Sequence, residues 1–205
     1  MATSVKQPTT VGRKRVNNPA FLPPGYEVPD RARQFMKIEP GDNPVRILSG
    51  PLVGYVFFTD DKKPVRRPYN PDSKTLGDFT REELTEMNAR KNENGEFEGS
   101  RHFWMMLVWD RKTNSPKVLE ITQITIIKAL YSLLEDKDWG DLRRFDINIH
   151  REGTGKFDTE FTVTPKPHQP ISSEVLTLMH DLKDKGLFDL QAIWKGKYPF
   201  EKYVW

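Results

Sequence analysis

The chain contains no cysteine among its 205 residues. This absence excludes a disulfide framework, thiol catalysis and thiolate zinc sites, and it suits a reducing compartment such as the cytoplasm. No apolar run approaches the roughly 20 residues that span a bilayer, so we expect no membrane partner. The basic N-terminus has no apolar segment behind it and does not resemble a secretory signal.

Signatures of catalysis and metal binding are also missing. The sequence has no Walker loop, no dinucleotide-binding fingerprint and no nucleophile elbow. Asp136, Asp138 and Asp141 surround Trp139 after a predicted helix end, where a polar turn is the simpler interpretation. The four histidines show no ligand spacing: His102, His150, His168 and His180. We therefore expect neither an enzyme nor a cofactor or metal.

The charge is uneven along a chain whose length suits one domain with tails. The formal net charge is +3, with 36% hydrophobic and 30% charged residues. Residues 1–70 hold twelve Lys or Arg against six Asp or Glu, whereas the remainder holds twenty against twenty-three. A basic surplus suits a polyanionic partner, although solvated surfaces often carry one as well.

Three regions are expected along the chain. Residues 1–32 contain five prolines and the basic cluster 13–15, which indicates a flexible arm that either closes on nucleic acid or only aids solubility. Residues 33–168 form the folded domain, with an inserted loop at 59–100. Residues 169–205 supply a C-terminal helix and an aromatic tail.

The order of predicted elements indicates the fold. Strands are expected at 34–38, 45–58, 102–109, 117–121, 144–150 and 156–163, and helices at 123–135 and 173–185. From residue 45, three strands, a helix and a hairpin follow in the order of an oligonucleotide/oligosaccharide-binding (OB) barrel. We therefore predict a mainly β fold with peripheral helices: a five-stranded OB barrel, a long insertion between strands 1 and 2, and a C-terminal helix. An α+β sheet with two covering helices gives a similar order.

Side-chain periodicity predicts how the helices pack and begin. Thr122 is expected to cap the helix over 123–135, and Thr80 with Glu83 has capping-box spacing in the insertion. Ile124, Ile127, Tyr131 and Leu134 share one face of the 123–135 helix, which Ile126, Leu130 and Leu133 widen. In the last helix, the shared apolar face contains Val175, Leu178, Met179 and Leu182.

Aromatic residues beside positive charge indicate binding of single-stranded nucleic acid. Bases stack on flat side chains at about 1–3 kcal/mol each, and Lys or Arg follow the backbone. In an OB barrel, strands 2 and 3 and the loops joining strands 1–2 and 4–5 form the binding face. The predicted contact residues on these pieces are Lys62, Lys63, Arg66, Arg67, Tyr69, Arg101, Phe103, Trp104, Trp109, Arg151 and Lys156.

Each of these residues has a plainer alternative. The strand over 101–110 is apolar on both faces, so one face fills the barrel and the other needs a cover or a ligand. Its aromatic residues are therefore either core or base-stacking. Tyr69 lies in a basic loop where no neighbour resembles core, whereas the loop cations would also suit plain solvation.

Several segments together resemble the single-stranded DNA-binding proteins of tailed bacteriophages with an OB fold. They are GDNPVRILSGPLVGY, HFWMMLVWD, VLEITQ, DKDWGD, FDINIHREGTG and DTEFTVTP, within residues 34–168. The resemblance implies a sequence-independent protein that coats and protects single-stranded DNA during phage replication or recombination, in the host-cell cytoplasm. Replication or recombination enzymes would be its partners.

The C-terminal residues depart from that family. Many such proteins end in an acidic tail that recruits enzymes, whereas this chain ends in GKYPFEKYVW. One hypothesis is self-association through Tyr198, Phe200, Tyr203 and Trp205, and the alternative is that the tail packs on its own barrel. Two other functions stay open: an RNA or mixed nucleic-acid module, because stacking does not distinguish sugars, and a protein-interaction protein whose aromatics are core.

Overall fold

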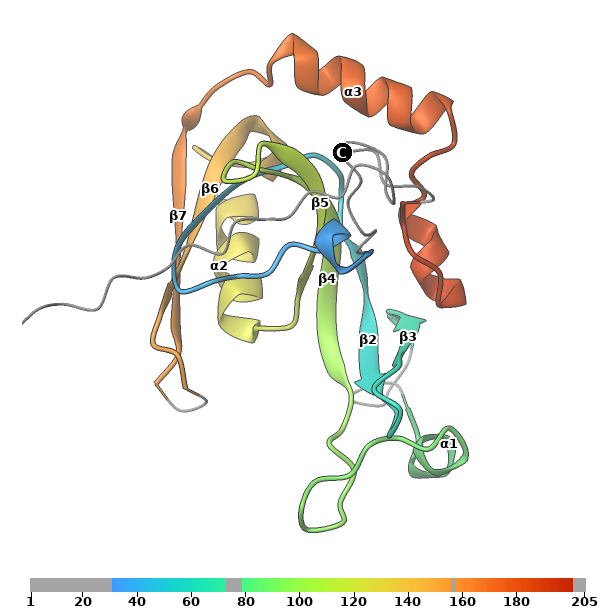
Figure 1. Ribbon diagram of the computed structural model, residues 1–205. Helices are drawn as coiled ribbons and strands as arrows, with labels where there is room; N and C mark the ends of the chain where they lie inside the picture. The colour runs from blue at the N-terminus through green and yellow to red at the C-terminus, as the bar shows by residue number, and fades with distance from the viewer. Residues whose placement is uncertain (1–30, 73–78, 156–157, 201–205) are drawn as a thin grey trace, which may run out of the picture. The chain divides into compact units, whose positions relative to one another are not determined.

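The computed structural model describes residues 31–72, 79–155 and 158–200, and it shows a mainly β fold built on an antiparallel sheet (Figure 1). The strands are β1 (Gly41–Ile47), β2 (Leu52–Phe58), β3 (Pro64–Pro68), β4 (Arg101–Asp110), β5 (Ser115–Ile121), β6 (Phe145–Glu152) and β7 (Glu160–His168). The α-helices are α1 (Arg81–Glu86), α2 (Ile124–Glu135) and α3 (Ser173–Asp184), and the 3-10 helices are η1 (Arg31–Gln34), η2 (Leu142–Arg144) and η3 (Leu190–Lys195). The predicted basic arm lies almost entirely outside the described residues.

β1 and β2 run as one interrupted strand along a single edge of β4. Ile47 pairs with Val108, and Leu52 pairs with Met105. From Ile47 to Leu52 the chain advances five residues, while the paired positions on β4 advance only three. Two extra residues therefore bulge out between β1 and β2. The predicted run at 45–58 is thus split where its glycine and proline lie, because such residues commonly mark bulges.

Two small residues adapt this long strand to its neighbours. At the bulge, the Ser49 hydroxyl accepts a hydrogen bond from the Leu107 N–H at 3.0 Å. A β-carbon at Gly54 would lie 2.3 Å from the Arg67 carbonyl oxygen and 3.0 Å from the Trp194 ring. Glycine at this position therefore allows β3 and η3 to approach β2 closely.

The remaining strands extend the sheet on both sides. β6 pairs with β1, β3 pairs with β2, β5 pairs with the other edge of β4, and β7 pairs with β6. In the described ranges no pairing joins β5 to β7, so the sheet is open. The described residues form seven strands where five were predicted, because the first predicted strand is split and the insertion contributes β3. β3, α1 and residues 87–100 form what we call the insertion lobe, at the bottom of Figure 1.

The segment after η1 lies along the free edge of β5. Phe35 forms a single parallel bridge with Val118, and the Met36 N–H donates to the Val118 carbonyl at 2.9 Å. The Arg151 guanidinium donates to the Ile38 carbonyl at 3.1 Å, which ties the segment to β6. The predicted strand at 34–38 is therefore wrong, since η1 ends at Gln34 and only one bridge follows.

The main core lies between the sheet and α2. Ile126, Ile127 and Leu130 are buried against apolar side chains of β1, β4, β5 and β6. The predicted apolar face of α2 is displaced: Tyr131, like Ile124 and Leu134, is exposed, because the narrower 126–130 stripe faces the sheet. The N-cap is Gln123, without a side-chain hydrogen bond, so the capping role expected of Thr122 is wrong.

A second core covers the other face of β4. Phe103 packs there with Leu182 of α3, Ile193 of η3 and Phe200. The predicted α3 face is confirmed, since Val175 and Leu182 are buried while Leu178 and Met179 pack partly buried. The second apolar face of the strand over 101–110 is therefore covered by the chain's own C-terminal segment.

Two further features complete the fold. The predicted capping box at Thr80 and Glu83 is present at the start of α1, above a small core in the insertion lobe. β7 lies at the edge of the sheet and contains Pro165 and Pro167, which lack the N–H donor that an added strand would use. In the described part of the chain, no helix has the length and apolar character needed to cross a membrane.

Candidate nucleic-acid interface

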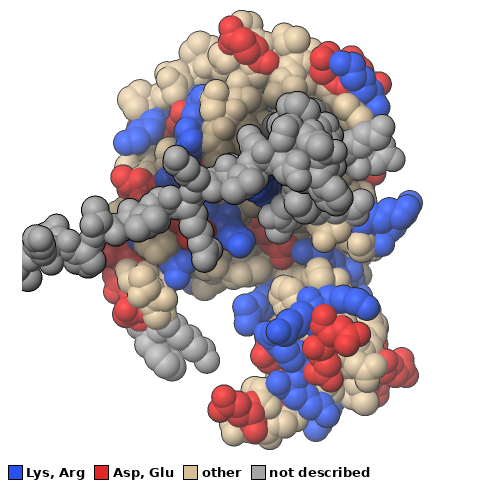
Figure 2. All heavy atoms as spheres, in the orientation of Figure 1, with Lys and Arg blue, Asp and Glu red and all other residues tan. Residues whose placement is uncertain are grey.

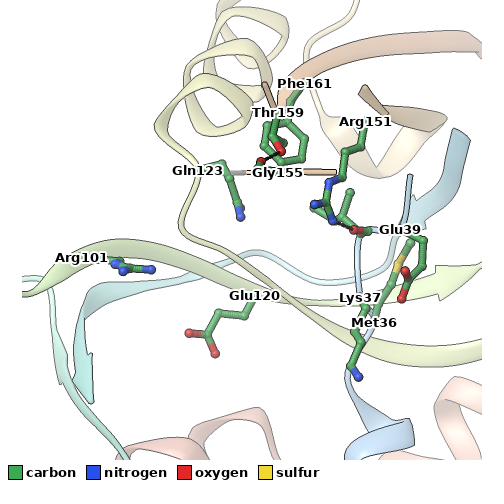
Figure 3. A pocket seen from close by; sticks show the side chains of 11 residues that line it. Met36, Lys37, Glu39, Arg101, Glu120, Gln123, Arg151, Gly155, Thr159 and Phe161 are labelled. Atoms are coloured by element: carbon green, nitrogen blue, oxygen red, sulfur yellow. Dashed lines mark hydrogen bonds between the residues drawn. The ribbon is translucent and has the colours of Figure 1, made fainter. Parts of the chain in front are cut away.

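Two adjoining cavities lie beside β5, and together they form what we call the groove. The first has a volume of about 730 Å³ and the second about 770 Å³. Lys37 and Glu120 line both, which places the cavities side by side. The first extends toward the β6–β7 turn, where Thr159 and Phe161 line it (Figure 3). The second extends between β3 and the segment after η3.

Positive charge dominates the groove. Its basic residues are Lys37, Lys63, Arg66, Arg101, Arg151 and Lys197, and its acidic residues are Glu39 and Glu120. Figure 2 shows lysine and arginine side chains also gathered on the insertion lobe, where acidic side chains are mixed with them. A concave surface lined mainly by one sign of charge concentrates the field and attracts a polyanion.

Aromatic rings lie among these cations. Phe35 and Tyr198 line the second cavity, with ring centroids 6.3 Å apart in an edge-to-face arrangement. Tyr198 is 46% exposed. Phe161 lines the first cavity and packs partly against the main core. The groove therefore combines an exposed flat ring with charged side chains, which is the combination that single-stranded nucleic acid requires.

Strand pairing holds two of the arginines in place. Arg66 lies opposite Val56 in the β2–β3 pair, and its Nη2 contacts a Glu120 carboxylate oxygen at 2.6 Å. Arg151 is the register partner of Gly41 and donates to the Ile38 carbonyl. Each guanidinium keeps a buried Nε without a hydrogen-bond partner.

A second aromatic cluster lies outside the groove lining. Tyr55 and His102 are register partners, with ring centroids 5.3 Å apart, and Tyr69 lies 6.3 Å from Tyr55 and 6.2 Å from His102. Burial lowers the pKa of His102 below its usual value, which favours the neutral ring. Tyr69 is exposed, which fits its expected place in a surface loop.

The groove brings together four of the predicted contact residues: Lys63, Arg66, Arg101 and Arg151. Lys62 is exposed in the β2–β3 turn with a left-handed backbone, at φ 60°. Arg67 pairs with Glu83 at 2.7 Å, and its guanidinium lies 4.3 Å from the centre of the Phe79 ring. Neither Lys62 nor Arg67 lines the groove.

Three of the predicted stacking residues lie on β4. Phe103 is 0% exposed and Trp109 is 7% exposed, so their rings are not available to a base and the expectation for both is wrong. Trp109 uses its indole N–H to donate to the Asn114 side chain at 3.1 Å. Trp104 is half-buried against the main core. Lys156 lies outside the described residues.

The residues predicted to support self-association lie in different surroundings. Phe200 is buried in the second core, where its ring centroid lies 4.7 Å from that of the tilted Phe188 ring, so it is not available to a neighbouring copy and that expectation is wrong. For Phe200, the alternative in which the tail packs on its own domain is correct. Tyr198 instead lines the groove. Tyr203 and Trp205 lie outside the described residues.

Several groove residues were not predicted from sequence. Lys37 follows η1 and Lys197 follows η3, and only the folded arrangement brings both to the same cavity as Glu120 of β5. Glu120 had a usable signal, because it is the polar position between Leu119 and Ile121 in a predicted strand. Alternation places such a residue on the face opposite the core.

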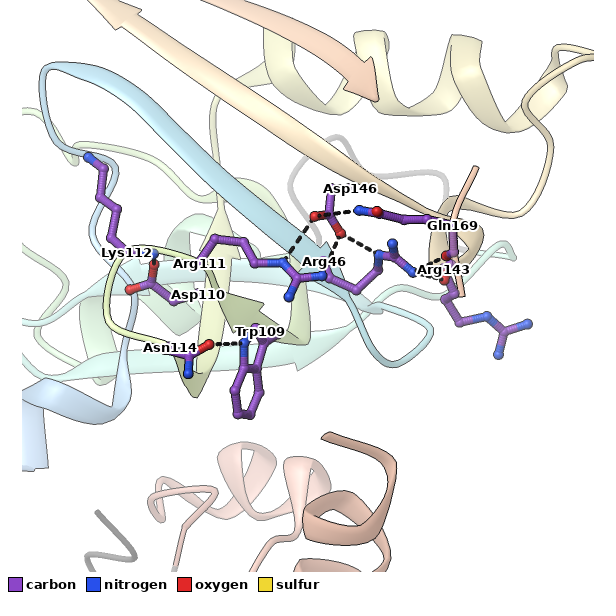
Figure 4. Close-up of polar contacts among 9 residues, drawn as sticks. All are labelled: Arg46, Trp109, Asp110, Arg111, Lys112, Asn114, Arg143, Asp146 and Gln169. Carbon is purple, nitrogen blue, oxygen red and sulfur yellow. Dashed lines mark hydrogen bonds and ion pairs between the residues drawn. The ribbon is translucent and has the colours of Figure 1, made fainter. Parts of the chain in front are cut away.

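The other polar clusters have structural roles. Asp146 accepts hydrogen bonds from Arg46, Arg111 and Gln169, and this network joins β1 to β6 (Figure 4). Asp136 accepts from the backbone N–H groups of Asp138 and Trp139, so the predicted polar turn is confirmed. Within the described ranges, no group of three or more His, Asp or Glu side chains could hold a metal ion.

The chain has a partial similarity to a phage protein. No protein-family model matches the chain, and no solved structure matches it. The chain is similar to a protein of Escherichia phage T5 described as a probable ssDNA-binding protein, with 28% identity over 141 residues. The match covers 63% of this chain and 54% of the phage protein, so the chain spans about half the length of that relative.

Proposed function

We propose that this chain binds single-stranded DNA without sequence preference, and that the groove along β5 holds the strand. The observation that carries the proposal is the lining of the groove, which combines six Lys or Arg side chains with the exposed ring of Tyr198. The similarity to a probable phage ssDNA-binding protein supports the choice of single-stranded DNA.

The strand pairing supports an OB-type barrel as the scaffold. If β1 and β2 count as the first strand, then β4, β5, α2, β6 and β7 follow in OB order. The groove lies where β5, the insertion and the β6–β7 turn meet, which is the region that OB proteins use for oligonucleotides. Phe35 and Met36 contact Val118 at the β5 edge that a closed barrel would pair.

The groove suits a backbone-led mode of binding. Lys37, Arg101 and Arg151 attract phosphates, and the ring of Tyr198 offers a stacking surface to any base. Such contacts do not read base edges, so the strand binds without sequence preference. A protein of this kind coats and protects exposed DNA during phage replication or recombination in the host cytoplasm.

Fluorescence anisotropy with labelled oligo-dT, duplex DNA and RNA at two salt concentrations tests the proposal. We expect tight binding of oligo-dT, weaker binding of duplex, and a steep loss of affinity as salt rises. Equal or tighter binding of RNA would instead support the RNA-binding alternative. Absence of binding to every strand would leave the protein-interaction alternative.

Paired variants locate the site. Replacing Lys37 and Arg101 together with alanine removes two groove cations and should lower the slope of log affinity against log salt by about two. Lys128→Ala, an exposed lysine of α2 outside the groove lining, is the control. Equal effects of the two changes would place the DNA elsewhere.

A further inference from the structure

A glutamate lies in the middle of a groove otherwise suited to a polyanion. Glu120 on β5 lines both cavities, and Figure 3 shows it among the residues of the first. Its carboxylate contacts Arg66 at 2.6 Å. A carboxylate at this position repels phosphate unless its charge is compensated, and Arg66 supplies that compensation.

The contact between Arg66 and Glu120 is incomplete. The side chains are 10% and 18% exposed, so both charges are largely removed from water. Only one guanidinium nitrogen, Nη2, is within hydrogen-bond distance of the carboxylate, and the buried Nε has no partner. Arginine pairs best with carboxylate or phosphate through two parallel hydrogen bonds. Both charges therefore lose their hydration without gaining the full set of hydrogen bonds that would compensate for it.

We propose that Glu120 occupies the phosphate position of Arg66 in the unbound protein and that a DNA phosphate replaces it on binding. This inference rests on the proposed function. Glu120 holds Arg66 over the groove and keeps it from other anions. Breaking the pair costs free energy, which a polymer offsets through its simultaneous contacts with Lys37, Arg101 and Arg151. A single nucleotide or free phosphate lacks those contacts, so the pair selects for a strand.

Glu120→Gln tests the exchange, because it removes the charge while keeping the size and polarity of the side chain. We expect oligo-dT to bind about fivefold tighter or more, since Arg66 is then held by a neutral group. Glu98→Gln is the matched control. It changes the net charge equally and releases Arg90, whose ion pair with Glu98 lies in the insertion lobe outside the groove lining. We expect the control to bind as the wild type does.

A double-mutant cycle separates exchange from general repulsion. In an Arg66→Ala background, Glu120→Gln should give a smaller gain, because it then relieves only the repulsion between the carboxylate and phosphate and no ion pair has to be broken. A gain of equal size in both backgrounds would mean that Glu120 only repels DNA, and it would overturn the exchange. Wild-type protein that fails to bind oligo-dT would refute the proposed function itself, which is a distinct outcome.

Free phosphate provides a second readout. Inorganic phosphate should compete with oligo-dT more effectively for the Glu120→Gln protein than for the wild type, because Arg66 is then open to small anions. If thermal melting shows that Glu120→Gln is unstable, Glu120→Ala replaces it in both measurements. Unchanged affinity and unchanged competition in a folded variant would overturn the proposal.

Discussion

Two tyrosines of similar exposure lie in different surroundings, and they offer a matched test of stacking. Tyr198 is 46% exposed and lines the groove, whereas Tyr131 is 53% exposed on α2. Tyr198→Ala should weaken oligo-dT binding by about 1–3 kcal/mol, the usual worth of one stacked base. Tyr131→Ala should leave the affinity unchanged. If both substitutions weaken binding equally in an anisotropy titration, Tyr198 does not stack on DNA.

His102 gives a prediction for pH at the same scale. Burial holds the pKa of its ring below the usual value of about 6.5. As pH falls below that value, the unfolded chain takes up a proton before the folded protein does, so the free energy of unfolding decreases. We expect the His102→Gln variant to lack this decrease when the free energy of unfolding is measured in urea at several pH values. An NMR titration midpoint for His102 at or above 6.5 would contradict the prediction.

At the scale of elements, one carboxylate joins two strands and a loop. Arg46 is almost fully buried, and Asp146 contacts it at 2.6 Å while also accepting from Arg111. Asp146→Asn leaves the Arg46 charge buried without a counterion, so we expect a loss of about 3–5 kcal/mol in unfolding free energy. Asp181→Asn breaks the exposed pair with Lys185 and should cost less than about 1 kcal/mol. Similar denaturant midpoints for the two variants would show that the network contributes little.

Elements that are determined by residues close together in the sequence could be predicted from it. The alternation of Phe145, Ile147 and Ile149 places them in the core, and the Thr80–Glu83 spacing forms a capping box as expected. Such patterns depend on local geometry alone. The orientation of α2 and the length of the pairing after η1 depend on where the sheet lies. Local periodicity therefore predicted the wrong buried face for α2 and a full strand where only a single bridge forms.

The candidate site was predictable in part for the same reason. Charged loops beside predicted strands indicated Lys63, Arg66, Arg101 and Arg151. Alternation within 101–110 does not reveal which face receives the C-terminal segment, about 90 residues later in the chain. That long-range contact decides that Phe103 belongs to the core.

At the scale of the whole molecule, the C-terminal segment belongs to the folded domain. Phe200 is buried with Ile193 against the outer face of β4, whereas the neighbouring Tyr198 is exposed. Phe200→Ala should therefore lower the unfolding free energy by about 3–5 kcal/mol without a specific loss of DNA affinity per folded molecule. Tyr198→Ala should do the reverse, with nearly normal stability and weaker binding. Comparable melting temperatures for the two variants would mean that residues near 200 contribute no core packing.

The prolines of β7 bear on how copies of the protein would be arranged along one strand of DNA. Adjacent copies that joined edge to edge would form a continuous ribbon, held by backbone hydrogen bonds that are slow to separate. Pro165 and Pro167 withdraw two donors from that edge. Neighbours that met at this edge would then do so through side chains or share only the DNA between them. Contacts of that kind would let the copies separate one at a time.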